Sequence, residues 1–379
     1  MNAAPAPALF TPIRLRELTL PNRVVVAPMC QYSAIDGCAQ PWHTVHLGQL
    51  AIGDAGLLII EATAVDAVGR ITPGCLGLYD DANEAAFAAL MKTLRGLDPA
   101  RHLPIAIQLG HAGRKASSFE PWRTGRQIPI ADGGWTAVAP SAIAHGDGEE
   151  APRAMSVAEL DALVGRFVDA TRRAERIGID AIELHAAHGY LLHQFLSPLS
   201  NRRDDAYGGS LENRMRFPLE VLAAMRAAWP ASRPLGVRIS ASDWDARSSW
   251  TIDEARVFAG RCEALGADWI DASSGGVSRE QKIAIGPGYQ VPFAREIRRA
   301  VDIPVMAVGL ITEATQAEAI LQAGDADMIA LARAFLYDPR WVWHAARELG
   351  ATVKVPPQYW RSEPAGARGL YGDTRVGMR

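Results

Sequence analysis

The sequence predicts a single α/β domain over residues 1–379, folded as a (β/α)8 or TIM barrel. Short apolar runs recur along the chain, and each is followed by a stretch rich in Ala, Leu, Arg and Glu with helical character. Eight parallel strands joined by right-handed helical crossovers close into a barrel without an exposed edge. The eight predicted strands are 24–29, 57–65, 104–110, 181–188, 235–240, 269–274, 305–309 and 328–333.

The elements around these strands fit the same architecture. Runs 13–15 and 18–20 predict a small hairpin that closes the barrel floor and carries no chemistry. A helix over 156–177 begins at Ser156, with Glu159 three residues on, and stops before Gly178; a second helix over 251–265 also ends at a glycine. The longest connections, 111–154 and 189–213, follow the third and fourth strands, at the end of a barrel where loops build active sites. Residues 351–379 form a C-terminal tail.

Composition excludes several classes of protein. Acidic residues outnumber basic ones by 42 to 39 without a basic tract, so small molecules are favoured as partners over nucleic acid. The four cysteines (Cys30, Cys38, Cys75 and Cys262) lack CxxC spacing, which indicates reduced cytoplasmic thiols rather than zinc, iron–sulfur or disulfide sites. No apolar run approaches the ~20 residues of a membrane span. The GxGxxG, Walker A and HExxH motifs are absent, so a Rossmann or P-loop fold has no support.

Polar residues interrupt several of the aliphatic runs. Gln108 stands between apolar neighbours in the third run, Glu183 and His185 in the fourth, and Arg238 in the fifth. Because side chains alternate along a strand, these residues share the face opposite the aliphatic one, near the carboxyl ends of their strands. They indicate one shared pocket, although a buried Gln or Arg can also serve only to satisfy its neighbours.

Two histidine pairs need different interpretations. His43 and His46 follow Trp42 and have no acidic partner nearby, so a structural or capping role is favoured and no metal site is predicted. His185, His188 and Tyr190 flank Gly189 at a strand end, which would bring two imidazoles and a phenol to one mouth.

The chemistry of this trio follows from its groups. Imidazoles can donate hydrogen bonds to an oxygen on which negative charge develops, and a phenol can supply a proton. Such a site suits a polarised carbonyl or nitro compound that receives hydride, and since no side chain delivers hydride, an organic cofactor is required.

Four separated motifs resemble the old yellow enzyme family, most closely the thermophilic-like subgroup that includes bacterial xenobiotic reductases. They are 27–32 (APMCQY), 185–190 (HAAHGY), 201–214 (NRRDDAYGGSLENR) and 330–333 (ALAR), and the resemblance covers nearly the whole chain in order. It implies an FMN-dependent ene-reductase, or NADPH dehydrogenase. Such an enzyme takes hydride from NADPH or NADH in a ping-pong cycle. It passes the hydride to the β carbon of an α,β-unsaturated carbonyl or nitro compound, and a tyrosine protonates the α carbon.

The resemblance also implies roles for particular residues. Tyr190, His185, His188 and Cys30 would be catalytic. Substrate, including inhibitory phenols, would contact Tyr32, both histidines and Arg361. The residues that would bind FMN are Ala27, Pro28, Met29, Cys30, Ala62, Gln108, Arg238, Gly309, Ala332 and Arg333. Ala332 stands where many relatives have glycine, and Tyr337 where some have a second arginine.

The C-terminal tail carries a further implication. Residues 358–361 (QYWR) resemble a segment that reaches a neighbouring subunit's site as an arginine finger. A homodimer or homotetramer is therefore expected, with residues from Tyr359 to Arg361 contributed to the neighbouring site. Residues 362–379 receive no assigned role.

Other classes remain as alternatives. A dihydroorotate dehydrogenase or a tRNA dihydrouridine synthase would also be an FMN barrel, but the tRNA enzyme needs a basic surface and usually a cysteine acid. A flavin storage or sensor protein would not need His185, His188 and Tyr190 together.

Overall fold

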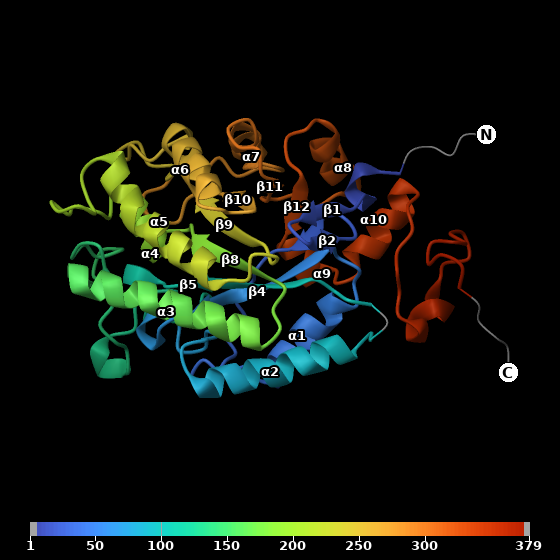
Figure 1. Ribbon diagram of the computed structural model, residues 1–379, viewed down its shortest axis with the longest axis horizontal. Helices are drawn as coiled ribbons and strands as arrows, with labels where there is room; N and C mark the ends of the chain where they lie inside the picture. Colours follow the sequence, from blue (N-terminus) through green and yellow to red (C-terminus); the bar gives the residue numbers. More distant parts are fainter. Residues whose placement is uncertain (1–5, 100, 375–379) are drawn as a thin grey trace.

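A computed structural model describes residues 6–99 and 101–374. Eight parallel strands form a closed barrel in the order β10-β11-β12-β3-β4-β5-β8-β9, with the helices arranged around it (Figure 1). This confirms the predicted (β/α)8 barrel and each predicted strand. The barrel strands are β3 (Val24–Val26), β4 (Leu57–Ala64), β5 (Ile105–Gly110), β8 (Ala181–Ala186), β9 (Leu235–Ser240), β10 (Trp269–Ser273), β11 (Val305–Ala307) and β12 (Met328–Leu331).

Several strands end earlier than predicted. β3 stops at Val26 and β8 at Ala186, so residues 27–29 and 187–188 lie outside the ladder. The apolar pattern in the sequence continues into residues 27–29 and 187–188 because these residues are still packed. Their backbone no longer pairs with the neighbouring strands and instead forms the mouth of the barrel. The loops at this end therefore carry the side chains of interest.

Ten helices surround the barrel in the described part of the chain. The predicted capping box of α3 is present: Ser156 Oγ accepts from Glu159 N, and Glu159 Oε2 accepts from Ser156 N at 2.9 Å. The α-helices are α1 (Pro41–Ala51), α2 (Asp81–Gly96), α3 (Val157–Arg176), α4 (Leu191–Leu196), α5 (Leu211–Ala228), α6 (Ile252–Ala264), α7 (Val291–Arg298), α8 (Ala314–Gln322), α9 (Arg333–Tyr337) and α10 (Trp341–Leu349). Short elements are η1 (Ala8–Phe10), η2 (Ala67–Gly69), η3 (Gly113–Lys115), η4 (Ile130–Asp132), η5 (Pro357–Ser362), β6 (Val138–Ala139) and β7 (Arg153–Ala154).

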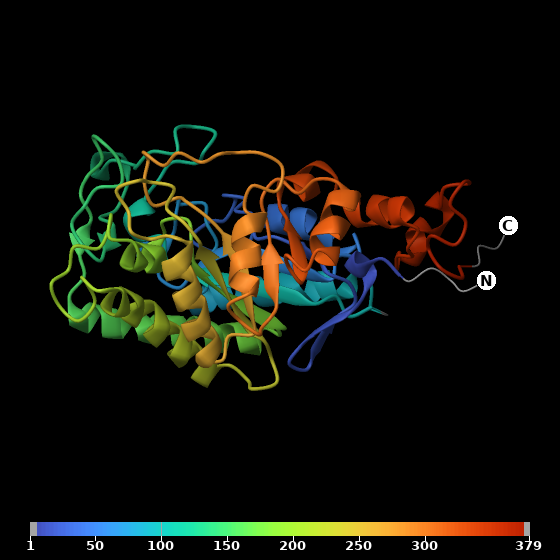
Figure 2. The same ribbon diagram turned by 90° about the horizontal axis from the view of Figure 1, so that it is seen from above.

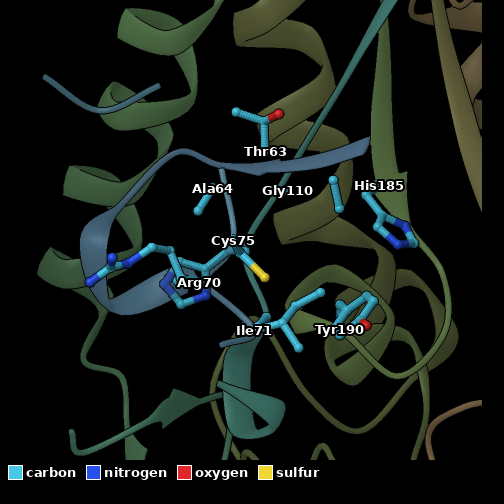
Figure 3. A pocket seen from close by; sticks show the side chains of 12 residues that line it. Thr63, Ala64, Arg70, Ile71, Cys75, Gly110, His185 and Tyr190 are labelled. Atoms are coloured by element: carbon cyan, nitrogen blue, oxygen red, sulfur yellow. The ribbon is translucent and has the colours of Figure 1, made fainter. Parts of the chain in front are cut away.

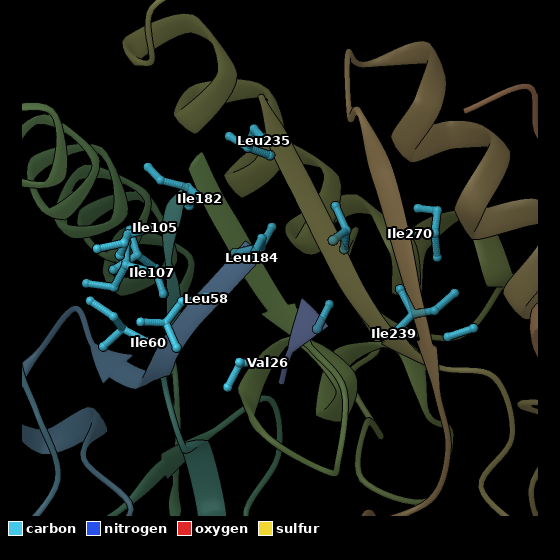
Figure 4. Packing of buried hydrophobic residues seen from close by; sticks show 14 of the residues in the cluster. Val26, Leu58, Ile60, Ile105, Ile107, Ile182, Leu184, Leu235, Ile239 and Ile270 are labelled. Atoms are coloured by element: carbon cyan, nitrogen blue, oxygen red, sulfur yellow. The ribbon is translucent and has the colours of Figure 1, made fainter. Parts of the chain in front are cut away.

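Strand alternation divides the apolar core into two layers. Outward-facing residues such as Ile107, Leu184 and Ile239 pack against the helices (Figure 4). Inward-facing residues, among them Ala106 and Trp269, form a separate cluster inside the barrel. Gly236 leaves room for the Trp269 ring, since a Cβ there would lie 2.0 Å from it.

The lower end of the barrel interior is closed by a hairpin. β1 (Ile13–Leu15) and β2 (Leu18–Leu20) pair antiparallel as predicted. Leu15 and Leu20 are buried in the interior cluster. The interior is thus apolar at the floor and polar toward the opposite end.

The C-terminal segment folds back on its own chain. Tyr359 and Tyr371 both pack edge-on against Trp343 of α10, with ring centroids 5.7 Å apart in each case. This segment lies at one end of the molecule's long axis in both views (Figures 1 and 2). The last five residues of the predicted tail, 375–379, lie outside the described residues. Within the described ranges, none of the helices combines the length and the apolarity that a membrane span needs.

Candidate active site

The turn after β8 brings three polar rings into contact. The His185 ring lies 5.2 Å from that of His188 and 5.0 Å from that of Tyr190, edge to face in both cases. His185 and Tyr190 line one small cavity with Cys75 and Ile71 (Figure 3). The predicted gathering of two imidazoles and a phenol at one mouth is therefore present.

Backbone geometry explains why this turn forms. His188 adopts φ +58° and Gly189 φ +70°, the left-handed region that favours glycine. A Cβ at Gly189 would lie 2.1 Å from the Gly276 carbonyl oxygen, so this position excludes other residues. Ser240 Oγ accepts from His188 N at 2.9 Å, and Ser273 Oγ lies 2.7 Å from His188 Nε2. Two neighbouring strands thereby fix the turn.

Burial keeps all three rings neutral. It lowers the pKa of His185 and His188 well below the ordinary value, and Arg238 acts in the same direction. Burial raises the pKa of Tyr190 well above its ordinary value. Lys115 Nζ lies 4.8 Å from the centre of the Tyr190 ring and donates to the His188 carbonyl oxygen at 2.8 Å. At neutral pH the site thus presents two neutral imidazoles and a protonated phenol.

Charged side chains occupy the neighbouring interior wall. Arg238 is in register with His185 on one side and Asp271 on the other, and its Nε lies 3.0 Å from Asp271 Oδ2. Glu183 accepts from Gln108 Nε2 at 2.8 Å. Burial and the nearby Asp271 raise the pKa of Glu183 to about 8. Gln108, Glu183 and Arg238 therefore share the interior face, as predicted.

The segment after β3 crosses the mouth and is held by a buried carboxylate. Glu61 Oε2 accepts from Gln31 N at 3.0 Å, and its other oxygen lies 3.5 Å from His43 Nε2. The prediction that His43 lacks an acidic partner is thus wrong, because the barrel brings β4 beside α1. His43 still has a capping role, since its Nδ1 accepts from Gln40 N. No group of three or more His, Cys, Asp or Glu side chains suited to a metal occurs among residues 6–99 and 101–374.

Cys30 lies in this crossing segment beside a second thiol. Cys75 approaches Cys30, and this contact together with burial raises the pKa of Cys30 well above its ordinary value. Cys75 Sγ itself accepts from Thr72 N at 3.3 Å. Cys30 is therefore a neutral thiol at physiological pH.

A second cavity, of about 160 Å³, lies between Arg238 and the ends of β11 and β12. Gly309, Ala332 and Arg333 also line it. No carboxylate in the described part of the chain forms an ion pair with Arg333, and buried Arg238 Nε has no aligned hydrogen-bond acceptor. A cavity lined by both Arg238 and Arg333 suits a group that carries a phosphate and a ring that becomes anionic on reduction, so these residues fit flavin mononucleotide.

The structure brings most of the other predicted residues to the barrel mouth and leaves Arg361 elsewhere. Ala62 lines the small cavity with His185, and Tyr32 lines an adjoining one with Tyr190. Ala27, Pro28 and Met29 follow β3 directly, with Ala27 N donating to the Leu331 carbonyl oxygen at 2.9 Å. Arg361 is not brought together with them: it lies on η5, outside the residues that line these cavities.

The sequence resembles known flavin enzymes over most of its length. Residues 8–351 match the model of the NADH:flavin oxidoreductase / NADH oxidase family. The NADPH dehydrogenase of Geobacillus thermodenitrificans is 44% identical over 355 residues, which cover 93% of this chain and 98% of that protein. The NADPH dehydrogenase of Bacillus subtilis is 42% identical over the same shares of each chain.

Solved structures of flavin enzymes also superpose on this barrel. Morphinone reductase superposes with a TM-score of 0.74 at 28% identity, covering 98% of this chain and 99% of that one. An old yellow enzyme homologue from Zymomonas mobilis gives 0.73 at 25% identity, over 95% and 99% of the two chains.

The chain belongs to the old yellow enzyme family. It is an FMN-dependent NAD(P)H oxidoreductase, which confirms the resemblance inferred from the four motifs. The family model spans the whole barrel and stops at residue 351, so it leaves out most of the tail.

Sequence reasoning missed several residues that support the site. Asp271 and Ser273 lie on the inward face of β10 and contact Arg238 and His188. Their alternation with Ile270 and Ala272 is the same signal that singled out Arg238. Glu61 interrupts the aliphatic run 57–65 in the same way that Arg238 interrupts its own run. Lys115 gave no comparable pattern, because it lies on η3, outside the predicted strands.

Proposed function

We propose that this enzyme reduces carbon–carbon double bonds conjugated to a carbonyl or nitro group, with NADPH or NADH as the hydride source. One observation carries the proposal: the His185 ring contacts the rings of both His188 and Tyr190 at the mouth of the barrel. This arrangement can hold an oxygen that gains negative charge and deliver a proton close by.

His185 and His188 bind the substrate oxygen. A neutral imidazole has one N–H donor, and donation to a carbonyl or nitro oxygen draws electrons from the conjugated β carbon. The low pKa of both rings suits this role, because a neutral donor does not surrender its proton to the oxygen. The same pair should bind phenols, since a phenolate resembles the charge that develops on the substrate.

Tyr190 protonates the α carbon. Its raised pKa keeps the proton on the phenol until a strongly basic carbon forms. The Lys115 ammonium over the ring stabilises the phenolate that is left behind.

The chain's remaining site residues hold FMN. When bound, FMN supplies the hydride chemistry, accepting hydride from NAD(P)H and passing it to the alkene. Ala27, Pro28, Met29 and Cys30 would lie against the ring, with Ala62 and Gln108 at its pyrimidine side. Arg238 would place its charge beside the ring, and Gly309, Ala332 and Arg333 would bind the phosphate.

Tyr32 and a neighbouring subunit complete the substrate site in this proposal. Tyr32 lies in the cavity that Tyr190 also lines. Arg361 would enter the site of a second copy as an arginine finger, with Tyr359, in a homodimer or homotetramer. Its position on η5, away from the cavities of its own chain, supports this role.

An anaerobic spectral experiment tests the function. NADPH should bleach the yellow flavin absorbance of the purified protein, and 2-cyclohexenone should then restore it while cyclohexanone forms. Bleaching that 2-cyclohexenone and a nitroalkene both fail to reverse would contradict alkene reduction. Protein that cannot be loaded with FMN would contradict the whole site.

A further inference from the structure

A second, strongly basic hollow begins beside the trio. A cavity of about 180 Å³ starts at Tyr32 and Tyr190, and a cavity of about 490 Å³ lies beyond it. Arg114, His145 and Arg279 line both cavities, so the two adjoin. The hollow thus leads from the ring site, past these three residues, to Arg202 and the outer loops.

The hollow is basic although the whole chain is slightly acidic. Five cationic side chains line it against three acidic ones, Asp147, Glu149 and Glu280. Glu149 pairs with Arg279, and Glu280 lies 3.0 Å from Arg247 Nη1.

The other three cations lack such partners. No acidic side chain of the described residues lies within ion-pair distance of Arg114, Lys115 or Arg202. Burial lowers the pKa of Arg114 to about 10 and that of Lys115 to about 8, as expected for positive charge held without an anion.

Buried hydrogen-bond donors also lack acceptors here. Arg114 is 6% exposed, and backbone carbonyl oxygens accept from its terminal nitrogens, at 2.6 Å in the case of Val277. Its Nε donates to no acceptor in the described part of the chain. His145 Nδ1, in a ring that burial keeps neutral by lowering its pKa, has no hydrogen-bond partner there either. Buried donors of this kind are normally satisfied, so the hollow is built to receive an acceptor.

We propose that this hollow binds the phosphate groups of the nicotinamide dinucleotide, with Arg202 and Arg279 contacting them from the outer cavity. The inference rests on the proposed function, because it requires the nicotinamide ring to reach the trio. Guanidinium groups match the geometry of phosphate oxygens, and a phosphate would supply both the acceptors and the negative charge that the hollow lacks.

The dimensions favour a dinucleotide over a simple anion. The two cavities run from Tyr190 past Arg114 to Arg202, whereas inorganic phosphate would fill only a small part of either. The cavity at Arg333 is separate and lies at the β11 and β12 side of the barrel. A dinucleotide with its ring at the trio can therefore extend its phosphates along the basic hollow.

Steady-state kinetics of the FMN-loaded enzyme test the proposal. Arg202→Ala and Arg279→Ala should each raise the KM for NADPH about tenfold, the usual effect of removing a charge-assisted contact. Turnover with 1-benzyl-1,4-dihydronicotinamide, a hydride donor without phosphate, should stay at the wild-type value. The matched control is Arg172→Ala, because Arg172 is an exposed arginine on α3 whose neighbour in the structure is Asp169.

Binding gives a readout independent of turnover. Calorimetry with adenosine 2′,5′-bisphosphate should show a dissociation constant about tenfold higher in both variants than in wild type and in Arg172→Ala. Wild-type values of KM and dissociation constant in both variants would overturn the proposal, as would equal losses with the phosphate-free donor. If the benzyl donor supports alkene reduction while the variants show no change with NADPH, this inference fails and the proposed function stands.

Discussion

The two walls of the barrel mouth differ in how they handle charge. On the β8 side, His185, His188 and Tyr190 are all neutral because burial penalises their ionised forms. On the β9 and β10 side, Arg238 and Asp271 form an ion pair at 3.0 Å with no exposure of the Asp271 side chain. The two walls are adjacent in the sheet, since His185 and Arg238 are register partners.

This difference matches the task that the proposed function gives to each wall. A group that delivers a proton must keep it until the reaction needs it, and desolvation achieves that. A wall that faces an anionic cofactor must keep a permanent charge, and a buried ion pair requires opposite charge close by. The protein separates the two tasks by placing them on different strands.

The largest expected effect is on the neutral wall, which His185, His188 and Tyr190 form. Tyr190→Phe should slow reoxidation of the reduced flavin by 2-cyclohexenone by about 10²–10⁴-fold, the usual contribution of a general acid. Reduction by NADPH should be almost unchanged, because that step needs no proton from Tyr190. Stopped-flow absorbance measures both half-reactions separately. Tyr337→Phe, at a residue 93% exposed, is the control, and equal slowing of both steps would contradict the role of Tyr190.

On the charged wall, which Arg238 and Asp271 form, Arg238→Leu should lower the free energy of unfolding by about 3–5 kcal/mol. The substitution leaves Asp271 buried without its counter-charge. Urea denaturation of the FMN-loaded protein measures the loss. Adding Asp271→Asn to Arg238→Leu should recover part of it, and a double variant less stable than Arg238→Leu would show that the ion pair is not the cause.

The proposed site binds the oxygen of a phenol through the histidines of the neutral wall. His185→Ala should raise the dissociation constant of a para-substituted phenol about 10–100-fold, because one donor to the charged oxygen is lost. Titration of the visible absorbance of the bound flavin measures it. His344→Ala, at an exposed histidine on α10, should bind the phenol as tightly as wild type. Unchanged binding in His185→Ala would remove His185 from the oxygen site.

The smallest effect, taken per pH unit, concerns the buried carboxyl of Glu183 on β8, two residues before His185. The raised pKa of Glu183, about 8, means that the folded protein retains a proton which the unfolded chain releases above about pH 4.3. The free energy of unfolding should therefore fall as pH rises from about 5 to about 8, by at most roughly 1.4 kcal/mol per pH unit. Glu183→Gln should reduce this slope in urea denaturation, whereas Glu212→Gln, on an exposed residue of α5, should retain it. A slope that survives in Glu183→Gln would place the titrating group elsewhere.

The sequence was sufficient for the barrel because its signal is local. Each strand shows as an aliphatic run, and inward polar positions such as Gln108 and Arg238 break the alternation where they stand. The turn at His188 and Gly189 was predictable for the same reason, since the three rings lie within six residues.

The rest of the site depends on contacts between distant segments. Glu61 accepts the hydrogen bond from the Gln31 backbone only after β3 and β4 have paired. Lys115 follows β5 and Tyr190 follows β8, so they meet only when the barrel has formed. The charge state of His185, His188 and Tyr190 also depends on burial, which cannot be read from the sequence. The basic hollow was missed for this reason, because Arg114, Arg202 and Arg279 come from three different loops.

The hairpin at the floor has a kinetic consequence. Because Leu15 and Leu20 close the lower end of the barrel, ligands reach the rings from the opposite end. In the proposed reaction the nicotinamide and the alkene therefore bind one after the other through the same opening, and an excess of either should inhibit the other.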